Sequence, residues 1–517
     1  MPYIDLDRRF QPFKEDHDPE ELPTSQFRYW GGLIDGVAWE ELLQNPFVVV
    51  LGEAGSGKTS EFEAQVERIR QDQRFAFFVR AEDLVDGRFS DAVDPDDHKI
   101  LETWRYGNDE ALFFVDAVDE ARIAHQANVF DKVLTKLRGD LADAKSRARF
   151  VISCRVSDWN PHADLQTFKA FIARCRLAED GKAQEPRLVT LLPLDAKRAR
   201  NFAAALGVAD TDEFMTAVDR AGLDAYSSRP RDVEWLVAFW KEKHRFGSLT
   251  EMMEANIAAR LREENEQRTA RDPLSPDRAR TGAEALAAAA TLGKTFTIAL
   301  PHSAAQSTEV GRSANAEHAL PDWTRAEIDA LLTRAIFDPA TLGRVRFHHR
   351  STQEYLAACW LIQRQAEGVP FDRIRDLVIG EVFGTDYAVP SMHGVAGWLA
   401  SKLPELRHDL MKVAPEIPLF EGDSAQFPIE DREAILRRLA SRFRSGMRLP
   451  WGYGGSPYHR FADRRLAPPI LQLLQSERDQ IHTIDLLLRL VEAGRIAECA
   501  DAALAIARDE TSESGTR

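Results

Sequence analysis

The segment from Phe47 to Ser60 contains the residue types that a phosphate-binding loop needs. Its sequence, FVVVLGEAGSGKTS, places G-x-x-x-x-G-K-T directly behind a run of apolar residues. The glycines allow backbone conformations that a side chain would forbid, so successive N–H groups can turn toward one anion. The ammonium group of Lys58 can reach the β- and γ-phosphates of a nucleotide, and the Thr59 hydroxyl is a hard oxygen ligand for Mg²⁺. The predicted nucleotide contacts in this loop are Gly52, Glu53, Ala54, Gly55, Ser56, Gly57, Lys58, Thr59 and Ser60.

A second acidic motif follows another apolar run. The residues Ala111 to Val115 predict a buried strand, and Asp116 comes directly after it. A carboxylate at the carboxyl end of a parallel strand lies where open α/β sheets bind ligands. It can hold Mg²⁺ through water while Thr59 holds the ion directly. The predicted metal ligands are therefore Thr59 and Asp116.

Two further carboxylates, Asp119 and Glu120, are candidates for catalysis. A carboxylate beside an in-line water can orient that water and accept its proton. Either residue could instead cap the helix that follows, because an acidic group suits a helix N-terminus. The choice between the two as the base stays open.

These residues require a parallel sheet to position them. Strands are predicted at Phe47 to Leu51, 74–79, 111–115, 149–155 and 187–192, which gives a five-stranded α/β core of the P-loop NTPase type. The extra strand from Arg74 to Val79, between the two motifs, suggests a sheet of the additional-strand type.

Composition limits the class of protein. The chain has 517 residues, too many for one core, and its 44% hydrophobic and 29% charged residues are typical of a globular protein. Its four cysteines are scattered without metal-ligand spacing, which favours a reducing, cytoplasmic location. No apolar run is long enough to span a bilayer. The formal net charge of −16 argues against nonspecific nucleic-acid binding over the whole surface.

The acidic motif resembles that of the NACHT family of signal-transduction (STAND) NTPases of bacterial type. Ala117, a small residue, stands directly after Asp116, and the acidic pair follows, whereas the typical AAA+ pattern has a glutamate in the position of Ala117. The resemblance implies ATP or ADP as ligand, Mg²⁺ as cofactor and a helical lid, a winged-helix-like domain and a C-terminal helical region after the core.

The resemblance also assigns roles to three later residues. Arg155, at the end of the fourth strand in the chain, would lie near the γ-phosphate and assist catalysis; an ordinary surface ion pair is the alternative. Pro230 would pack beside the nucleotide, or simply begin a helix. The segment from Val345 to Ala358 is similar to the signature F-x-H-x-x-x-Q-E-[FY]-x-A-A, in which His349 would bond the β-phosphate of ADP. His348 is expected to be structural or exposed.

Five regions are predicted along the chain. They are a lead segment (1–45), the NACHT-like NTPase core (46–194), a helical lid (195–265), a winged-helix-like domain (266–365) and a mostly helical C-terminal region (366–517), whose short amphipathic helices are compatible with the start of a HEAT-like repeat sensor. Whether the chain is complete or the front of a longer repeat protein is left open. The arginine- and aromatic-rich interval from Arg437 to Arg465 could contact nucleic acid, form a protein interface or pack on neighbouring helices.

The sequence therefore predicts a slowly hydrolysing ATPase, with GTP as an alternative substrate, that acts as a switch. ADP would hold it closed, and a trigger at the C-terminal region, a protein or less readily a nucleic acid, would permit ATP exchange and self-association. The effector would act in trans. An Ala- and Arg-rich chain with few lysines suits a GC-rich bacterium, where such proteins resemble antiviral defence sensors. The competing hypotheses are an AAA+-like remodelling ATPase and a nucleotide-gated scaffold without turnover.

Overall fold

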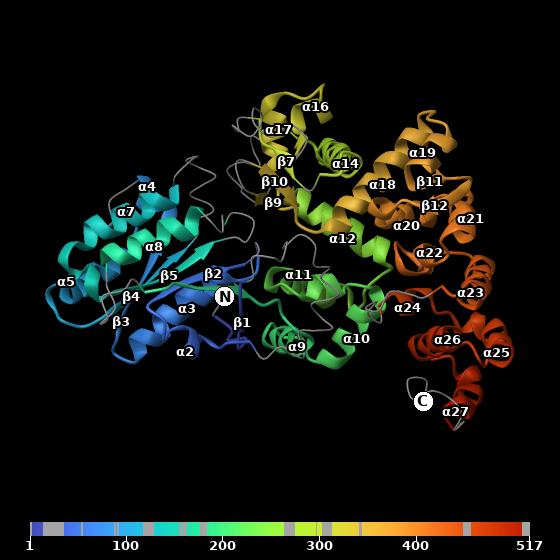
Figure 1. Ribbon diagram of the computed structural model, residues 1–517, viewed down its shortest axis with the longest axis horizontal. Helices are drawn as coiled ribbons and strands as arrows, with labels where there is room; N and C mark the ends of the chain where they lie inside the picture. The colour runs from blue at the N-terminus through green and yellow to red at the C-terminus, as the bar shows by residue number, and fades with distance from the viewer. Residues whose placement is uncertain are drawn as a thin grey trace.

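The computed structural model describes most of the chain (Figure 1). The residues that it describes are 3–13, 36–52, 55–86, 89, 92–116, 129–154, 159, 163–175, 184–262, 274–295, 297–301, 313–340, 344–447 and 456–508. Within them, an α/β part built on one large sheet is followed by a mainly helical part that runs to the C-terminus.

Six strands form the large sheet. They are β1 (Phe10–Pro12), β2 (Phe47–Leu51), β3 (Phe75–Arg80), β4 (Ala111–Asp116), β5 (Ala148–Cys154) and β6 (Arg187–Leu191). Their order across the sheet is β1-β6-β2-β5-β4-β3, and every neighbouring pair is parallel except β1 and β6. The prediction of five parallel strands is confirmed, and β1 adds an antiparallel edge strand that the sequence did not indicate.

The sheet has an additional strand between β2 and β4, as predicted, but this strand is not the one that the sequence suggested. The strand between β2 and β4 is β5, whereas β3, which covers the predicted strand from Arg74 to Val79, lies at the edge of the sheet. Strand β5 runs between β2, which precedes the phosphate loop, and β4, which ends at Asp116. Its polar residue Ser153 is opposite Val50 of β2. The sheet thus places Ser153 beside both motifs.

Buried residues cover both faces of the sheet. Along β2, Phe47, Val49 and Leu51 join one hydrophobic core, while Val48 and Val50 join another, as the period of two residues requires. The helices of this part are α2 (Trp39–Leu42), α3 (Lys58–Gln71), α4 (Ala81–Asp86), α5 (His98–Tyr106), α7 (Val129–Leu141) and α8 (Ala163–Cys175). Residues of α2 and α3 pack in the core of Val48, and residues of α4, α5, α7 and α8 in the core of Phe47.

Four helices follow the sheet where the sequence predicts a lid. They are α9 (Ala196–Ala205), α10 (Thr211–Ala221), α11 (Pro230–Lys243) and α12 (Leu249–Leu261). Side chains of Asp195, Asp210 and Ser248 cap the N-termini of α9, α10 and α12, because each accepts a hydrogen bond from a backbone N–H of the first turn. Pro230 occupies the first turn of α11, where its missing N–H is not needed.

The next region combines helices with a small sheet. Its helices are α14 (Pro276–Leu292), α16 (Ala316–Ala319), α17 (Arg325–Leu332) and α18 (Arg350–Ala366). Its strands are β7 (Ile298–Ala299), β8 (Ala314–Asn315), β9 (Phe337–Ala340) and β10 (Arg344–Phe347), in the order β8-β7-β10-β9. In Figure 1 this region lies above α11 and α12, beside the end of the large sheet.

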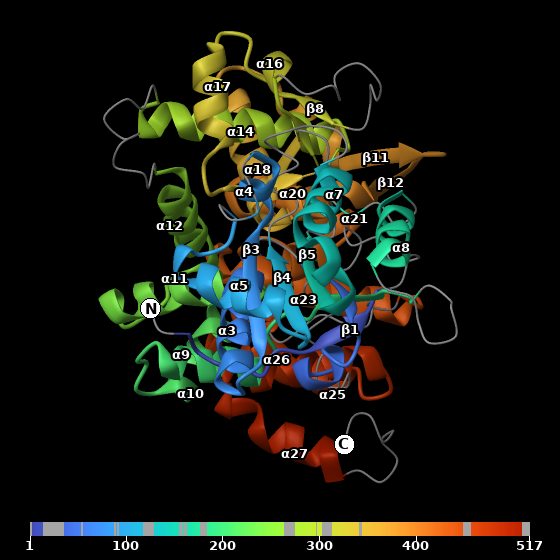
Figure 2. The same ribbon diagram turned by 90° about the vertical axis from the view of Figure 1, so that its left-hand side faces the viewer.

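The C-terminal region is mostly helical but contains one β-hairpin. Its helices are α19 (Phe371–Val378), α20 (His393–Lys402), α21 (Pro404–Val413), α22 (Glu416–Phe420), α23 (Ile429–Arg444), α24 (Ser456–Phe461), α25 (Ala467–Ser476), α26 (Ile481–Gly494) and α27 (Ala500–Arg508). The hairpin of β11 (Ile379–Val382) and β12 (Thr385–Ala388) was not predicted. Figure 2 shows this hairpin projecting away from the neighbouring helices.

One hydrophobic core runs through most of the described residues after the sheet. It includes residues from α9 to η8, a 3₁₀ turn at Ala497–Cys499, so the lid, the small-sheet region and the C-terminal helices share buried contacts. The large sheet has its own two cores. No helix among the described residues combines the length and apolarity needed to cross a membrane.

Candidate functional site

The phosphate loop connects β2 to α3. Gly52 donates its backbone N–H to the carbonyl of Cys154 at 3.1 Å, which fixes the start of the loop to β5. Gly55 and Gly57 have φ values of 68° and 89°, in the left-handed region that favours glycine. Gly57 directly precedes α3, so the loop ends at a helix N-terminus, where backbone N–H groups attract anions.

Lys58 and Thr59 lie at the beginning of that helix. The Nζ atom of Lys58 donates to the carbonyl oxygen of Gly52 at 2.7 Å, across the loop. The hydroxyl of Thr59 donates to Oδ2 of Asp116 at 2.6 Å. The two strongest sequence motifs therefore meet at one point, although 57 positions separate these residues in the chain.

Asp116 is held by β5 as well. The hydroxyl of Ser153 donates to Oδ1 of Asp116, and the carboxylate is buried. With Thr59 on one oxygen and Ser153 on the other, the carboxylate has a fixed orientation. A hydroxyl and a carboxylate supply the hard oxygen ligands that Mg²⁺ prefers, so the donor set fits that ion. Sequence reasoning missed Ser153, although a polar residue within an apolar strand was a usable signal.

Several predicted site residues lie outside the described residues. These are Glu53, Ala54, Asp119, Glu120 and Arg155. Their roles stay predictions.

Helices α9 to α12, which we call the lid after the predicted region that they occupy, reach the phosphate loop, and so does the small-sheet region. A Cβ atom built on Gly57 would lie 3.5 Å from Cγ of Pro230, at the start of α11. A Cβ atom on Gly55 would lie 3.5 Å from Cβ of Arg231 and 3.9 Å from Cε1 of His348. Pro230 thus lies beside the loop, and His348 is the histidine whose ring approaches Gly55.

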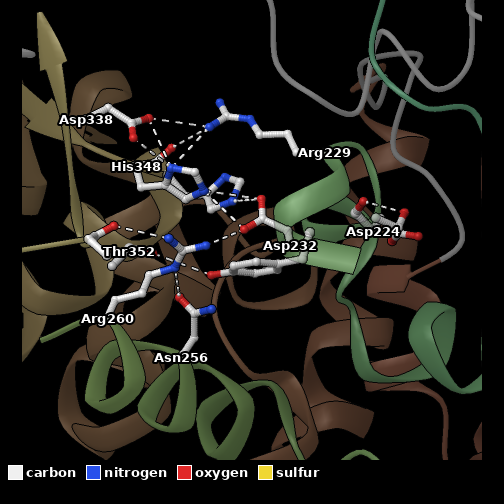
Figure 3. A network of polar contacts seen from close by, with 12 residues as sticks. Asp224, Arg229, Asp232, Asn256, Arg260, Asp338, His348 and Thr352 are labelled. Carbon is white, nitrogen blue, oxygen red and sulfur yellow. Dashed lines mark hydrogen bonds and ion pairs between the residues drawn. The ribbon is translucent and has the colours of Figure 1, made fainter. Parts of the chain in front are cut away.

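His348 and His349 belong to a buried polar network centred on Asp232 of α11 (Figure 3). Nε2 of His348 is 3.1 Å from Oδ1 of Asp232, and Nε2 of His349 is 2.9 Å from Oδ2. Arg260 of α12 also forms an ion pair with Asp232. We call the residues Arg229, Asp232, Arg260, Asp338, His348 and His349 the Asp232 network.

The network joins the lid to the small-sheet region. Asp338 of β9 accepts from Nδ1 of His348 at 3.0 Å, and Arg229 of the lid lies 3.5 Å from that carboxylate. Arg260 also donates to the carbonyl of Ala335 at 3.1 Å. Residues far apart in the sequence therefore converge on one buried carboxylate, as Figure 3 shows. His348 is buried rather than exposed.

Burial and hydrogen bonding set the protonation of the network. Burial acts to raise the pKa of Asp232, yet His349 and His348 together hold that pKa well below its usual value. Burial lowers the pKa of His349 to about 4, although Asp232 opposes the shift. The pKa of Asp338 is also held below its usual value, because His348 and Arg229 outweigh the effect of burial. At neutral pH both carboxylates are therefore ionised and His349 is neutral.

The donor atoms of Asp232, His348 and His349 lie within 4.8 Å of one another, a spacing that is compatible with a metal site. The charges argue otherwise. Arg229 and Arg260 supply two positive charges against the two carboxylates, which balances the network even with neutral histidines. A buried dication would leave two positive charges uncompensated, at high desolvation cost. We interpret the network as a buried ion cluster that joins α11 and α12 to the small-sheet region. Sequence reasoning missed Asp232, since only the fold brings its partners together.

In the arginine- and aromatic-rich interval, described arginines pair within the chain. Arg437 donates to Gln472 of α25 at 2.9 Å, Arg442 donates to the carbonyl of Val413, and Arg444 lies 3.2 Å from Glu477. These contacts show packing on neighbouring helices.

Comparisons with known proteins add little. No protein-family model matches the chain, and no curated protein matches it. Among solved structures, the ORC2 protein of Aeropyrum pernix, in ADPNP and ADP complexes, is similar at 14% identity and a TM-score of 0.28. The match covers 69% of this chain and 99% of that one. A TM-score this low does not establish a shared fold. The description of the site therefore depends on the geometry of this chain, which has an α/β core with a phosphate-loop arrangement, followed by a helical region.

Proposed function

We propose that this chain binds ATP and ADP with Mg²⁺, hydrolyses ATP slowly and acts as a STAND-type molecular switch of the NACHT kind. One observation carries the proposal: three parts of the chain meet at the phosphate loop. Lys58 belongs to the core, Pro230 and Arg231 to the lid, and His348 to the small-sheet region. A nucleotide bound there would contact elements that must move relative to one another when a switch opens.

The described residues support nucleotide binding directly. The left-handed glycines and the start of α3 provide N–H groups for the phosphates, and Lys58 provides the neutralising charge. Thr59 would hold Mg²⁺, with Asp116 binding it through water. Asp119 or Glu120 would orient the attacking water, since a base is required to activate it.

The Asp232 network supports a closed state. It ties the lid to the small-sheet region, which in this proposal is the winged-helix-like domain, while His348 lies near the phosphate loop. In the proposed cycle ADP stabilises this arrangement, with His349 as the predicted β-phosphate contact. A trigger at the C-terminal helices allows exchange for ATP, opening and self-association. Such a switch would serve bacterial antiviral defence or signalling in the cytoplasm, with its effector in another chain.

Two other functions are compatible with the same loop. A remodelling ATPase of the AAA+ type would turn over rapidly and respond to substrate, and a scaffold would bind ATP without hydrolysis. Ala117 and the pattern around His349 favour the switch over the first. The complete set of Lys58, Thr59 and Asp116 favours it over the second.

Nucleotide identification and turnover test the proposal. Purified protein should carry ADP, and ATP hydrolysis should be slow, while Lys58→Ala should carry no nucleotide and show no binding by calorimetry. Wild-type affinity for ATP in Lys58→Ala would overturn the phosphate-loop assignment. Fast, substrate-stimulated turnover would favour the remodelling ATPase instead.

A further inference from the structure

The N-terminal residues 3–13, here called the N-terminal strap, connect the two halves of the nucleotide site. Leu6 packs in the hydrophobic core shared by the lid and the later regions. Only four positions later, Phe10 packs in a core of the large sheet, and β1 pairs with β6. The strap therefore crosses from the lid to the sheet within five residues.

Arg8 lies at the middle of this crossing and is 3% exposed. Its Nη1 donates to the carbonyl oxygen of Ser56 in the phosphate loop at 2.7 Å. Its Nη2 donates to the carbonyl oxygen of Leu192 at 2.8 Å, directly after β6 and before the lid. One guanidinium group thus joins the phosphate loop to the segment that leads into the lid.

The bond to Ser56 orients the loop. The C=O of Ser56 and the N–H of Gly57 belong to one peptide unit, and no described peptide bond is cis. In a planar trans peptide these groups point in opposite directions. Because Arg8 holds the carbonyl on its own side, the Gly57 N–H points to the opposite side, where the predicted loop binds its anion. A cationic donor also polarises that peptide more strongly than a neutral one.

The surroundings keep Arg8 charged. Burial lowers the pKa of Arg8 to about 10, although nearby Glu61 opposes the shift, so the group is protonated at neutral pH. Glu61 itself accepts from Tyr3 at 2.9 Å and from Trp39 at 3.0 Å, which fixes this counter-charge in place. Nε of Arg8 is buried without a hydrogen-bond partner in the described part of the chain.

We propose that Arg8 is a positioning residue of the nucleotide site, which preorganises the Ser56–Gly57 peptide and couples the phosphate loop to the lid through Leu192. This inference rests on the proposed function, because it assumes that the loop binds nucleotide phosphates. Within the N-terminal strap, it assigns only the Arg8 side chain to the nucleotide site.

The test compares the full-length variants Arg8→Gln and Arg8→Lys with Arg9→Gln. Arg9 is the adjacent arginine, pairs with Asp7 and does not contact the loop among described residues, so its variant is the matched control. ADP affinity is measured by calorimetry, and KM and kcat for ATP by turnover. Loss of a hydrogen bond from a charged group should weaken ADP binding about tenfold in Arg8→Gln. Arg8→Lys should show a smaller loss, because an ammonium group keeps the charge but not the fork geometry.

The turnover data separate positioning from a merely structural role. Since Arg8 orients the loop in both the ground and transition states, KM should rise while kcat changes less than about threefold. ADP affinity in Arg8→Gln within twofold of wild type and of Arg9→Gln would overturn the inference. If Arg8→Gln does not fold, Arg8→Lys decides, and wild-type ADP affinity in that folded variant overturns it. Absence of nucleotide binding by the wild-type chain would instead refute the proposed function.

Discussion

Asp232→Asn should destabilise the helical part of the molecule strongly. The Asp232 side chain is 0% exposed and forms a buried ion pair with Arg260, whose side chain is 9% exposed. Removing one partner of such a pair leaves the other charge uncompensated, which typically costs about 3–5 kcal/mol. The asparagine keeps one oxygen that can accept a hydrogen bond from Arg260 or His349. We therefore expect a loss of about 3 kcal/mol in the free energy of unfolding.

The matched control is Asp485→Asn. Asp485 forms an ion pair with Arg489 one turn away on α26, and both side chains are 47% exposed. Because water screens exposed pairs, this substitution should cost only about 0.3–0.5 kcal/mol. The two variants carry the same chemical change, each within a helix, and the substituted residues differ in burial.

Urea unfolding followed by circular dichroism measures both variants, because the region that shares the Asp232 network is mainly helical. A double-mutant cycle with Arg260→Gln should show that Asp232→Asn costs much less when Arg260 is already replaced, since both changes remove the same pair. A loss below about 1 kcal/mol in Asp232→Asn, or additive effects in the cycle, would refute the interpretation of the Asp232 network as a latch, meaning the contact that holds the lid against the small-sheet region in the closed state.

Three further predictions follow from individual residues. At least one of the variants Asp119→Asn and Glu120→Gln should keep ATP binding, measured by calorimetry, and lose ATP hydrolysis by about 10²-fold or more. Normal hydrolysis in both variants would mean that the two carboxylates only cap a helix. His349→Ala should release ADP about ten times faster and self-associate without a trigger. His348→Ala should have the same effect, because His348 also contacts Asp232. ADP off-rates like that of wild type in both variants would contradict the role of the Asp232 network in the closed state. Burial raises the pKa of Glu354 to about 7, so the folded chain keeps a proton that the unfolded chain loses near pH 4.5. The free energy of unfolding should therefore fall by at most about 3 kcal/mol as pH rises between these values. Glu354→Gln should remove this pH dependence in urea unfolding, and an unchanged pH dependence would refute the assignment.

The sequence was most informative where the physical requirement is local. The phosphate loop could be predicted because left-handed glycines, a preceding apolar strand and Lys58 are all encoded within a few residues. The five parallel strands could be predicted because their buried residues form short apolar runs. The edge strand β1 could not, since it is only three residues long and is defined by pairing with β6, far along the chain.

The parts of the site that depend on distant residues could not be predicted. Asp232 follows Pro230 in an unremarkable helix start, and its significance depends on Arg260 and two histidines more than a hundred positions away. Arg8 belongs to no recognisable motif and becomes a candidate only because the strap crosses between two hydrophobic cores. The hairpin β11–β12 was missed because its neighbours are helices, although Gly384 at its turn was a usable signal.

The molecular mass of the full-length chain in different nucleotides tests the central claim most directly. Light scattering is measured with ADP and with a non-hydrolysable ATP analogue, for wild type and for Asp232→Asn, in which the proposed latch is weakened. We expect a monomer with ADP in the wild type, and a larger assembly with the analogue in Asp232→Asn without any trigger. If Asp232→Asn binds both nucleotides and stays a monomer in both, the chain is not a nucleotide-controlled switch of this kind.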